Sequence, residues 1–184
     1  MTQQVGESRL VLPDWACVSE KRKGHITRVV SLLMRWADEI EIGEDERLTW
    51  RDAGLLHDAL RDAPESELRR LSGDETREEE LLHGPAVANL LESQGNTSAS
   101  LLEAVRFHTV GSPRWDRAGR ALYMADFLEP GRGFLKSYRA FLAVQVPHDF
   151  DGVFRQVLRT RLEHALREGF TLFPETVGLW NEVR

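Results

Sequence analysis

The sequence predicts an all-α fold, a single-domain helical bundle of about seven or eight helices. Apolar residues recur at the three- and four-residue spacing of amphipathic helices in most segments. Apolar and polar residues almost never alternate with the period of two that indicates a strand. Proline and glycine residues separate the helical segments. With 184 residues, the chain is long enough for one domain with a large core of its own.

The N-terminal third is expected to hold an arm and two helices. Residues 1–18 are interpreted as an arm or a short first element, with Pro13 and Trp15 as anchors, and residues 19–184 as the domain. A helix is predicted from Ser19 to Ile40, followed by a polar connection over 43–48. The second helix is predicted to begin at Thr49, where Asp52 three residues on resembles a capping box.

The boundaries of the remaining helices are predicted from helix-breaking and helix-capping residues. Residues 74–80 are mostly acidic and expected to be solvated. Proline at a first helical position and glycine after a last one are typical helix boundaries. We expect helices over 65–71, from His83-Gly84-Pro85 to Gly95-Asn96, over 98–108, over 117–128, over 136–146, from Asp149 or Asp151 to Arg167 with Gly169 as C-cap, and from Pro174.

Composition excludes several classes of function. The net charge of -6 argues against a nucleic-acid-binding protein, which needs a basic surface. No apolar stretch approaches the length of a membrane span, and Met1 to Trp15 lacks the basic start and apolar core of a secretory signal. We therefore expect a cytoplasmic protein without a membrane or nucleic-acid partner. Cys17 is the single cysteine and is interpreted as a packed thiol, so a thiolate metal cluster is excluded.

Metal-ligating side chains recur along the chain. His57-Asp58 closes the apolar run Ala53-Gly54-Leu55-Leu56, where ionisable groups are costly to bury unless something binds them. Further candidate ligands lie in or beside other helical segments: His25, His83, His108 and Asp126. A single buried histidine is more often an ordinary hydrogen-bonded residue, and His148-Asp149 shows that the dipeptide alone carries little weight. The order of all six candidates on successive helices is the stronger signal.

Two metal ions could share these ligands. One ion would take His25, His57, Asp58 and Asp126, and the second would take Asp58, His83 and His108, with one oxygen of Asp58 on each. Open positions would hold water or phosphate. Nitrogen and oxygen ligands suit iron, manganese, zinc or magnesium, and the ligand types alone do not choose among these metals.

The ordered motifs resemble the HD superfamily of metal-dependent phosphohydrolases, and in particular its bacterial symmetrical diadenosine tetraphosphate hydrolase branch. The Asp126 segment is specific to this branch, whereas the His-Asp pair is general to the superfamily. Two positions depart from the branch pattern, Arg61 in place of a lysine and Val110 in place of a threonine. The matching segments are Arg22-Lys23-Gly24-His25, Leu55-Leu56-His57-Asp58, His83-Gly84-Pro85, Arg106 to Gly111, Tyr123 to Arg132, and Pro174, Thr176 and Asn181.

The resemblance implies a hydrolase that cleaves diadenosine tetraphosphate into two ADP by attack of a metal-bound hydroxide. The implied cofactor is one or two metal ions, with iron placed first and manganese, cobalt, zinc or magnesium as alternatives. The implied partner is a small nucleotide substrate, and family precedent suggests a homodimer. Asp58, Asp62 and Arg61 are candidate catalytic residues. Candidate phosphate contacts are Arg22, Arg61, Thr109, Gly111 and Arg132.

Two other functions fit the same sequence. The first is an HD-type nucleotide phosphohydrolase of different specificity. The second is a non-catalytic HD module that binds a nucleotide and signals to a partner. The complete ligand set argues against the second, because a binding module need not keep every metal ligand.

Overall fold

The structure is a computed structural model that describes residues 11–184. Over these residues it contains nine α-helices, one short 3-10 helix and no strand, which confirms the all-α fold with slightly more helices than expected. The elements are α1 (Glu20–Ile40), α2 (Glu44–Leu56), α3 (Glu65–Ser72), η1 (Glu79–Leu81), α4 (His83–Ser93), α5 (Ala99–Phe107), α6 (Arg117–Leu128), α7 (Lys136–Gln145), α8 (Phe150–Glu168) and α9 (Pro174–Val183).

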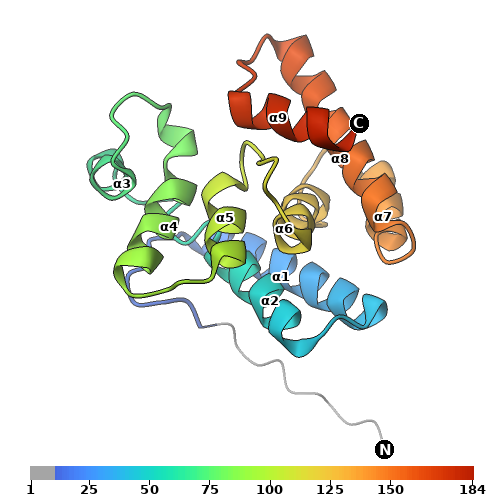
Figure 1. Ribbon diagram of the computed structural model, residues 1–184, viewed down its shortest axis with the longest axis horizontal. Helices are drawn as coiled ribbons and strands as arrows, with labels where there is room; N and C mark the ends of the chain where they lie inside the picture. Colours follow the sequence, from blue (N-terminus) through green and yellow to red (C-terminus); the bar gives the residue numbers. More distant parts are fainter. Residues whose placement is uncertain (1–10) are drawn as a thin grey trace, which may run out of the picture.

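The central element is α6, which lies in the middle of the bundle (Figure 1). Its residues from Ala121 to Leu128 are all buried, and the helix contacts α1, α2, α5, α7 and α8. A helix that is apolar on all sides is expected at the centre of a bundle. Any polar side chain near the end of α6 is therefore placed inside the protein.

A glycine brings α1 and α2 close together. A Cβ on Gly54 would lie 2.7 Å from the Leu33 side chain and 3.1 Å from that of Val30. The absence of a side chain at this position lets the last turn of α2 approach α1. This close packing sets the distance between His25 on α1 and His57 at the end of α2.

The start of α2 differs from the prediction. The helix begins at Glu44, so residues 44–48 are helical and the predicted polar connection is wrong. Thr49 is not a capping residue, because its hydroxyl donates to the carbonyl of Asp45 one turn back, at 3.0 Å. The helix has no side-chain cap and starts instead with three acidic residues, Glu44 to Glu46, which are favourable near the positive end of a helix dipole.

Other predicted boundaries are confirmed. Asp149, rather than Asp151, caps α8, and Gly169 ends the same helix in the left-handed conformation with φ 73°. Ser98 caps α5 and Asp116 caps α6. A polar side chain therefore satisfies the free amides at the start of each of these three helices.

The described part of the arm lies along the segment that follows Asp58. Cys17 accepts a backbone hydrogen bond from Asp62 and donates one to Ala59, at 3.2 and 2.8 Å, while Trp15 packs against the core. Residues 1–10 of the predicted arm lie outside the described residues. Among the described helices, none has the length and apolar character needed to cross a membrane.

Candidate metal centre

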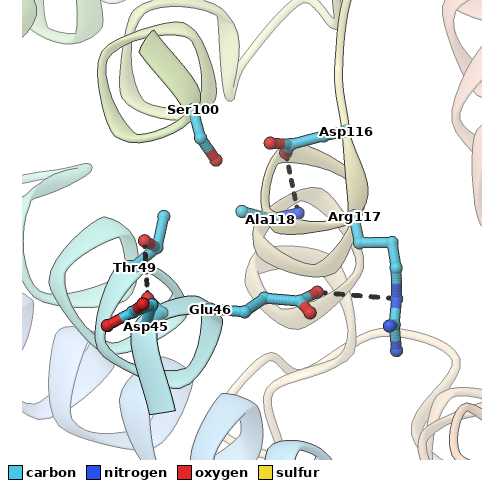
Figure 2. A pocket seen from close by; sticks show the side chains of 7 residues that line it. All are labelled: Asp45, Glu46, Thr49, Ser100, Asp116, Arg117 and Ala118. Atoms are coloured by element: carbon cyan, nitrogen blue, oxygen red, sulfur yellow. Dashed lines mark hydrogen bonds and ion pairs between the residues drawn. The ribbon is translucent and has the colours of Figure 1, made fainter. Parts of the chain in front are cut away.

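Three neighbouring helices end at the same place. His57 and His108 are the C-cap residues of α2 and α5, and Asp126 lies in the last turn of α6. At the other end, residues from the first turns of the same helices line one pocket of about 330 Å³, which Figure 2 shows. The three helices therefore run in the same direction, and their C-terminal ends converge on the candidate ligands.

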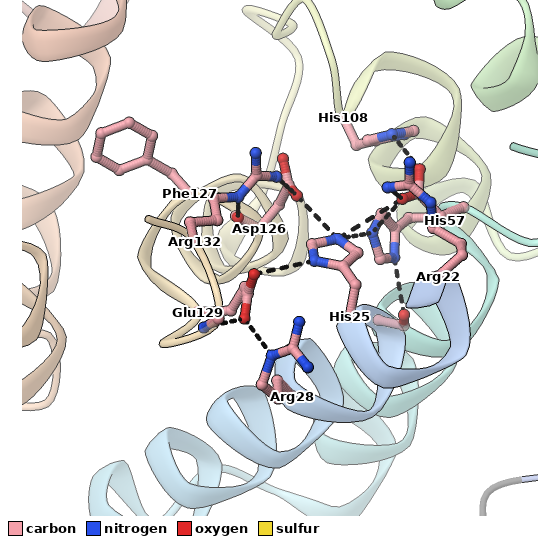
Figure 3. Close-up of polar contacts among 12 residues, drawn as sticks. Arg22, His25, Arg28, His57, His108, Asp126, Phe127, Glu129 and Arg132 are labelled. Carbon is pink, nitrogen blue, oxygen red and sulfur yellow. Dashed lines mark hydrogen bonds and ion pairs between the residues drawn. The ribbon is translucent and has the colours of Figure 1, made fainter. Parts of the chain in front are cut away.

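The first group of ligands combines α1, α2 and α6, and we name it the Asp126 cluster: His25, His57 and Asp126. Their side chains point toward one another in Figure 3. The Nε2 atom of His25 lies 3.2 Å from Oδ1 of Asp126 and 3.3 Å from Nε2 of His57. All three residues are at most 9% exposed.

The second group, named the His83 cluster, consists of Asp58, His83 and His108. Oδ1 of Asp58 lies 3.1 Å from Nε2 of His83 and 3.6 Å from Nε2 of His108. The other oxygen of Asp58, Oδ2, lies 3.6 Å from Nε2 of both His25 and His57. Asp58 thus lies between the two clusters and presents one carboxylate oxygen to each.

Hydrogen bonds from the opposite side of each ring fix the orientation of three imidazoles. Nδ1 of His57 donates to the carbonyl of Gly54, and Nδ1 of His108 donates to the carbonyl of Val105, both at 2.8 Å. Each carbonyl is three residues earlier, in the last turn of the helix that the histidine caps. Nδ1 of His25 lies 3.3 Å from the buried carboxylate of Glu129. Such bonds orient metal-binding histidines and set their tautomers.

The donor set fits a cation. Backbone carbonyls can only accept, so His57 and His108 each carry a proton on Nδ1, and Nε2 is the atom that each ring presents to the clusters. These Nε2 atoms face the carboxylate oxygens of Asp58 at 3.6 Å, which is longer than a hydrogen bond. Nitrogen and oxygen ligand atoms gathered in a buried site are typical of a metal centre, and the His/Asp clusters suggest divalent metal binding.

The ionisation of His57, His83 and Asp58 also favours a cation. Burial lowers the pKa of His57 to about 4 and lowers that of His83, so both rings are neutral. Burial opposes ionisation of Asp58, but the neighbouring histidines hold its pKa well below the usual range. Burial also lowers the pKa of His25, yet the Asp126 and Glu129 carboxylates outweigh it and raise the pKa to about 9. Neutral imidazoles and ionised carboxylates are the forms that bind metals, so His25 must release its proton when it binds one.

Arginines surround the two clusters. Nη1 of Arg22 lies 2.7 Å from Oδ2 of Asp58. Arg132 donates from Nε to the backbone carbonyl of Asp126, at 2.7 Å, and from Nη2 to its carboxylate. Two of the five predicted phosphate contacts therefore lie against candidate metal ligands, and Figure 3 shows Arg132 beside Asp126.

The other predicted site residues have different surroundings. Arg61 is partly exposed, and none of the described residues forms an ion pair with it. The carboxylate of Asp62 accepts the Ser19 amide at 2.7 Å, at the start of α1. The hydroxyl of Thr109 lies 3.2 Å from Nε2 of His108. The Gly111 amide donates to the Phe107 carbonyl at 2.7 Å, so this N–H is already used by the protein.

Two arginines of the site were not among the candidate residues. Arg28 binds the Glu129 carboxylate at 2.5 Å. Its position three residues after His25 places it on the same helix face as that ligand, so the sequence alone could have indicated it as a site residue. Arg161 on α8 reaches Asp126. No motif marks Arg161, and it lies 35 positions after Asp126 in the sequence, so its role depends on the tertiary fold.

Comparisons with known proteins agree with this geometry. The family model for the HD domain matches residues 22–131, more than half of the chain. The chain is 24% identical over 178 residues to the symmetrical bis(5'-nucleosyl)-tetraphosphatase of Bacillus subtilis, covering 90% of this chain and 93% of the relative. It is 26% identical over 139 residues to the protein of the same name from Halalkalibacterium halodurans, covering 71% and 73%. The crystal structure of a protein described as a predicted HD superfamily hydrolase involved in NAD metabolism, from Clostridium acetobutylicum, superposes with a TM-score of 0.76 at 25% identity, covering 90% of each chain.

Proposed function

Because the chain belongs to the HD domain family, we propose that it is a metal-dependent phosphohydrolase that cleaves diadenosine tetraphosphate into two ADP. The observation that carries the proposal is the convergence of six buried ligands on two clusters that share Asp58. The names of the relatives supply the substrate. We propose iron as the metal, with manganese, cobalt, zinc and magnesium as alternatives.

The two clusters correspond to the two sets of ligands expected from the sequence. His25, His57 and Asp126 would hold one ion, His83 and His108 the other, and Asp58 would bridge them. Bound metal ions supply Lewis acidity to a phosphoryl oxygen and lower the pKa of a water molecule. The protein contributes rings whose Nε2 atoms are fixed by bonds from Nδ1, so the ligands need little reorganisation.

The arginines would neutralise the charge of the substrate. Arg22 and Arg132 lie at the carboxylates of the two clusters, and Arg61 carries a positive charge without a carboxylate partner among the described residues. Guanidinium groups bind phosphate oxygens in pairs. A nucleoside diphosphate leaves as an anion at neutral pH, so the reaction requires charge neutralisation more than a proton. Asp62, which accepts the amide of Ser19, is therefore the less essential of the candidate catalytic residues.

The test is product analysis with protein loaded with one defined metal at a time. Incubation with diadenosine tetraphosphate should yield ADP alone, measured by chromatography. We expect Asp58→Ala to abolish both metal retention and turnover, because the variant removes an oxygen from each cluster. His164→Ala is the matched control, since His164 lies on the exposed part of α8. AMP plus ATP as products, or normal turnover by Asp58→Ala, would contradict the proposal.

A second candidate is an HD-type phosphohydrolase that acts on another nucleotide. The Clostridium acetobutylicum neighbour, which is described as involved in NAD metabolism, favours including NAD in the same assay. Turnover of NAD, and not of diadenosine tetraphosphate, would favour this candidate. No turnover of any nucleotide with any metal would favour a non-catalytic module.

A further inference from the structure

Arg161 reaches the candidate metal centre from outside the region that the HD family model matches. It lies on α8, whereas the match ends at residue 131. Its Nη2 atom donates to the carbonyl of Thr109 at 3.1 Å, and its Nη1 atom lies 3.8 Å from Oδ2 of Asp126. The residue thus connects α8 to the end of α5 and to the last turn of α6.

The environment holds the guanidinium group in place without using most of its donors. The group lies over the ring of Tyr123, 4.1 Å from the ring centre, and Tyr123 is buried. The distance to Asp126 is too long for a hydrogen bond. Within residues 11–184, the bond to Thr109 is the single hydrogen bond that this side chain donates, although a guanidinium has five N–H donors. The side chain is 24% exposed, so free donors are within reach of a ligand.

Arg161 and Arg132 flank the same carboxylate. Arg132 binds Oδ1 of Asp126, and Arg161 lies nearest to Oδ2. A metal ion bound to Asp126 would neutralise much of the carboxylate charge that now attracts both arginines. Two guanidinium groups beside a loaded metal site would then be left to attract another anion.

We propose that Arg161 is a polyphosphate-binding residue that selects substrates with several phosphates over substrates with one. The selection between substrates rests on the proposed function, whereas the binding of a polyphosphate by Arg161 does not. Metal ions would neutralise the phosphate under attack, and Arg161, beside Thr109, would bind a phosphate next to it. A substrate with a single phosphate would not reach Arg161, because its charge lies entirely at the metal ions.

The binding test uses inorganic tripolyphosphate and protein loaded with manganese, measured by isothermal titration calorimetry. We expect Arg161→Gln to weaken binding by about 10- to 100-fold, the effect of losing a hydrogen bond to a charged group. Arg159→Gln is the matched control, because it removes the same charge from an exposed site on the same helix, and binding should not change. Arg161→Lys should recover part of the affinity, since it keeps the charge and loses the planar fork.

A kinetic comparison separates phosphate binding from a structural role. With diadenosine tetraphosphate, Arg161→Gln should raise KM by a similar factor. With bis(4-nitrophenyl) phosphate, which has one phosphate, the loss of kcat/KM should be much smaller than with diadenosine tetraphosphate, and metal content should be unchanged. Equal losses on the two substrates, or a loss of metal, would show that Arg161 only positions Asp126 and would overturn the inference.

Failure of the inference can be distinguished from failure of the proposed function. If diadenosine tetraphosphate is not cleaved but tripolyphosphate binding depends on Arg161, the proposed function fails and the inference stands. If tripolyphosphate does not bind the wild-type protein, or binds Arg161→Gln equally well, the inference is wrong whatever the enzyme hydrolyses.

Discussion

Gly84 allows α4 to approach the end of α5, and replacing it should damage the His83 cluster. A Cβ at this position would lie 2.8 Å from the carbonyl oxygen of Val105, 3.0 Å from that of Arg106, and 3.2 Å from Nδ1 of His108. Two of these neighbours are backbone atoms in the last turn of α5, so they cannot move without shifting the helix. His83 is the adjacent residue, and its Nε2 atom lies 3.0 Å from that of His108.

The cost of Gly84→Ala follows from two opposing effects. Alanine in a helix is favoured over glycine by about 0.5–1 kcal/mol. Overpacking of a tight interior typically costs about 1–3 kcal/mol, and contacts of 2.8 and 3.0 Å with two backbone oxygens place this site toward the upper end. We expect a net loss of about 1–2 kcal/mol in the free energy of unfolding and weaker metal binding at the His83 cluster.

The assay combines urea denaturation with metal content measured by mass spectrometry. Gly24→Ala is the matched control, because Gly24 also lies near the start of a helix, next to a candidate ligand, His25. There the added Cβ meets only the flexible end of Arg28, at 3.3 Å, so stability should be equal or higher. If Gly84→Ala is as stable as the wild type and retains all its metal, the reasoning from the close contact is wrong.

Three further predictions follow from buried polar contacts. In metal-free protein, Glu129→Gln should lower the pKa of His25 from about 9, measured by NMR titration. A histidine whose pKa is raised by folding stabilises the folded state at pH values below its pKa in the unfolded chain. This stabilisation disappears as the pH rises through its pKa in the folded protein, so the variant should lose more stability at about pH 6 than at about pH 10. Arg139→Met should cost about 3 kcal/mol or more in urea denaturation, because the buried guanidinium donates to four backbone carbonyls. Trp36→Phe should cost about 1–3 kcal/mol, because the Ala143 carbonyl loses the indole donor at 2.8 Å.

Two of these predictions have a matched control. Glu163→Gln removes an exposed carboxylate on α8 and should leave the titration of His25 unchanged. Lys136→Met removes an exposed cation from α7, the helix that carries Arg139, and should cost little stability. An unshifted His25 titration in Glu129→Gln, or equal stabilities for Arg139→Met and Lys136→Met, would count against the assigned contacts.

Much of the site could be predicted because its residues break the pattern around them. His57 and Asp58 end an apolar run, where ionisable groups need a partner, and the structure buries both. Asp126 stands out for the same reason on α6, the most buried helix. Local sequence is sufficient to predict a site residue when a polar side chain occupies a position that the helical period assigns to the core.

The errors and omissions arise where local sequence offers competing signals or none. Thr49 and Asp52 resemble a capping box, but the first-turn carboxylates from Glu44 to Glu46 favour an earlier start for α2. Asp62 stays a predicted general acid or base, and the bond that it accepts from the Ser19 amide across 43 residues of sequence could not be predicted locally. Arg161 joins the site only because α8 packs against α6.

The common direction of α2, α5 and α6 affects the order in which a metal ion and a polyphosphate can bind. The C-terminal end of each helix carries about half a negative charge, and all three ends meet the ionised carboxylates of Asp58 and Asp126. A polyphosphate that approaches such a surface before any cation is present meets repulsion from every one of these groups. We therefore expect the proposed substrate to bind more tightly after the centre has been loaded with metal than before.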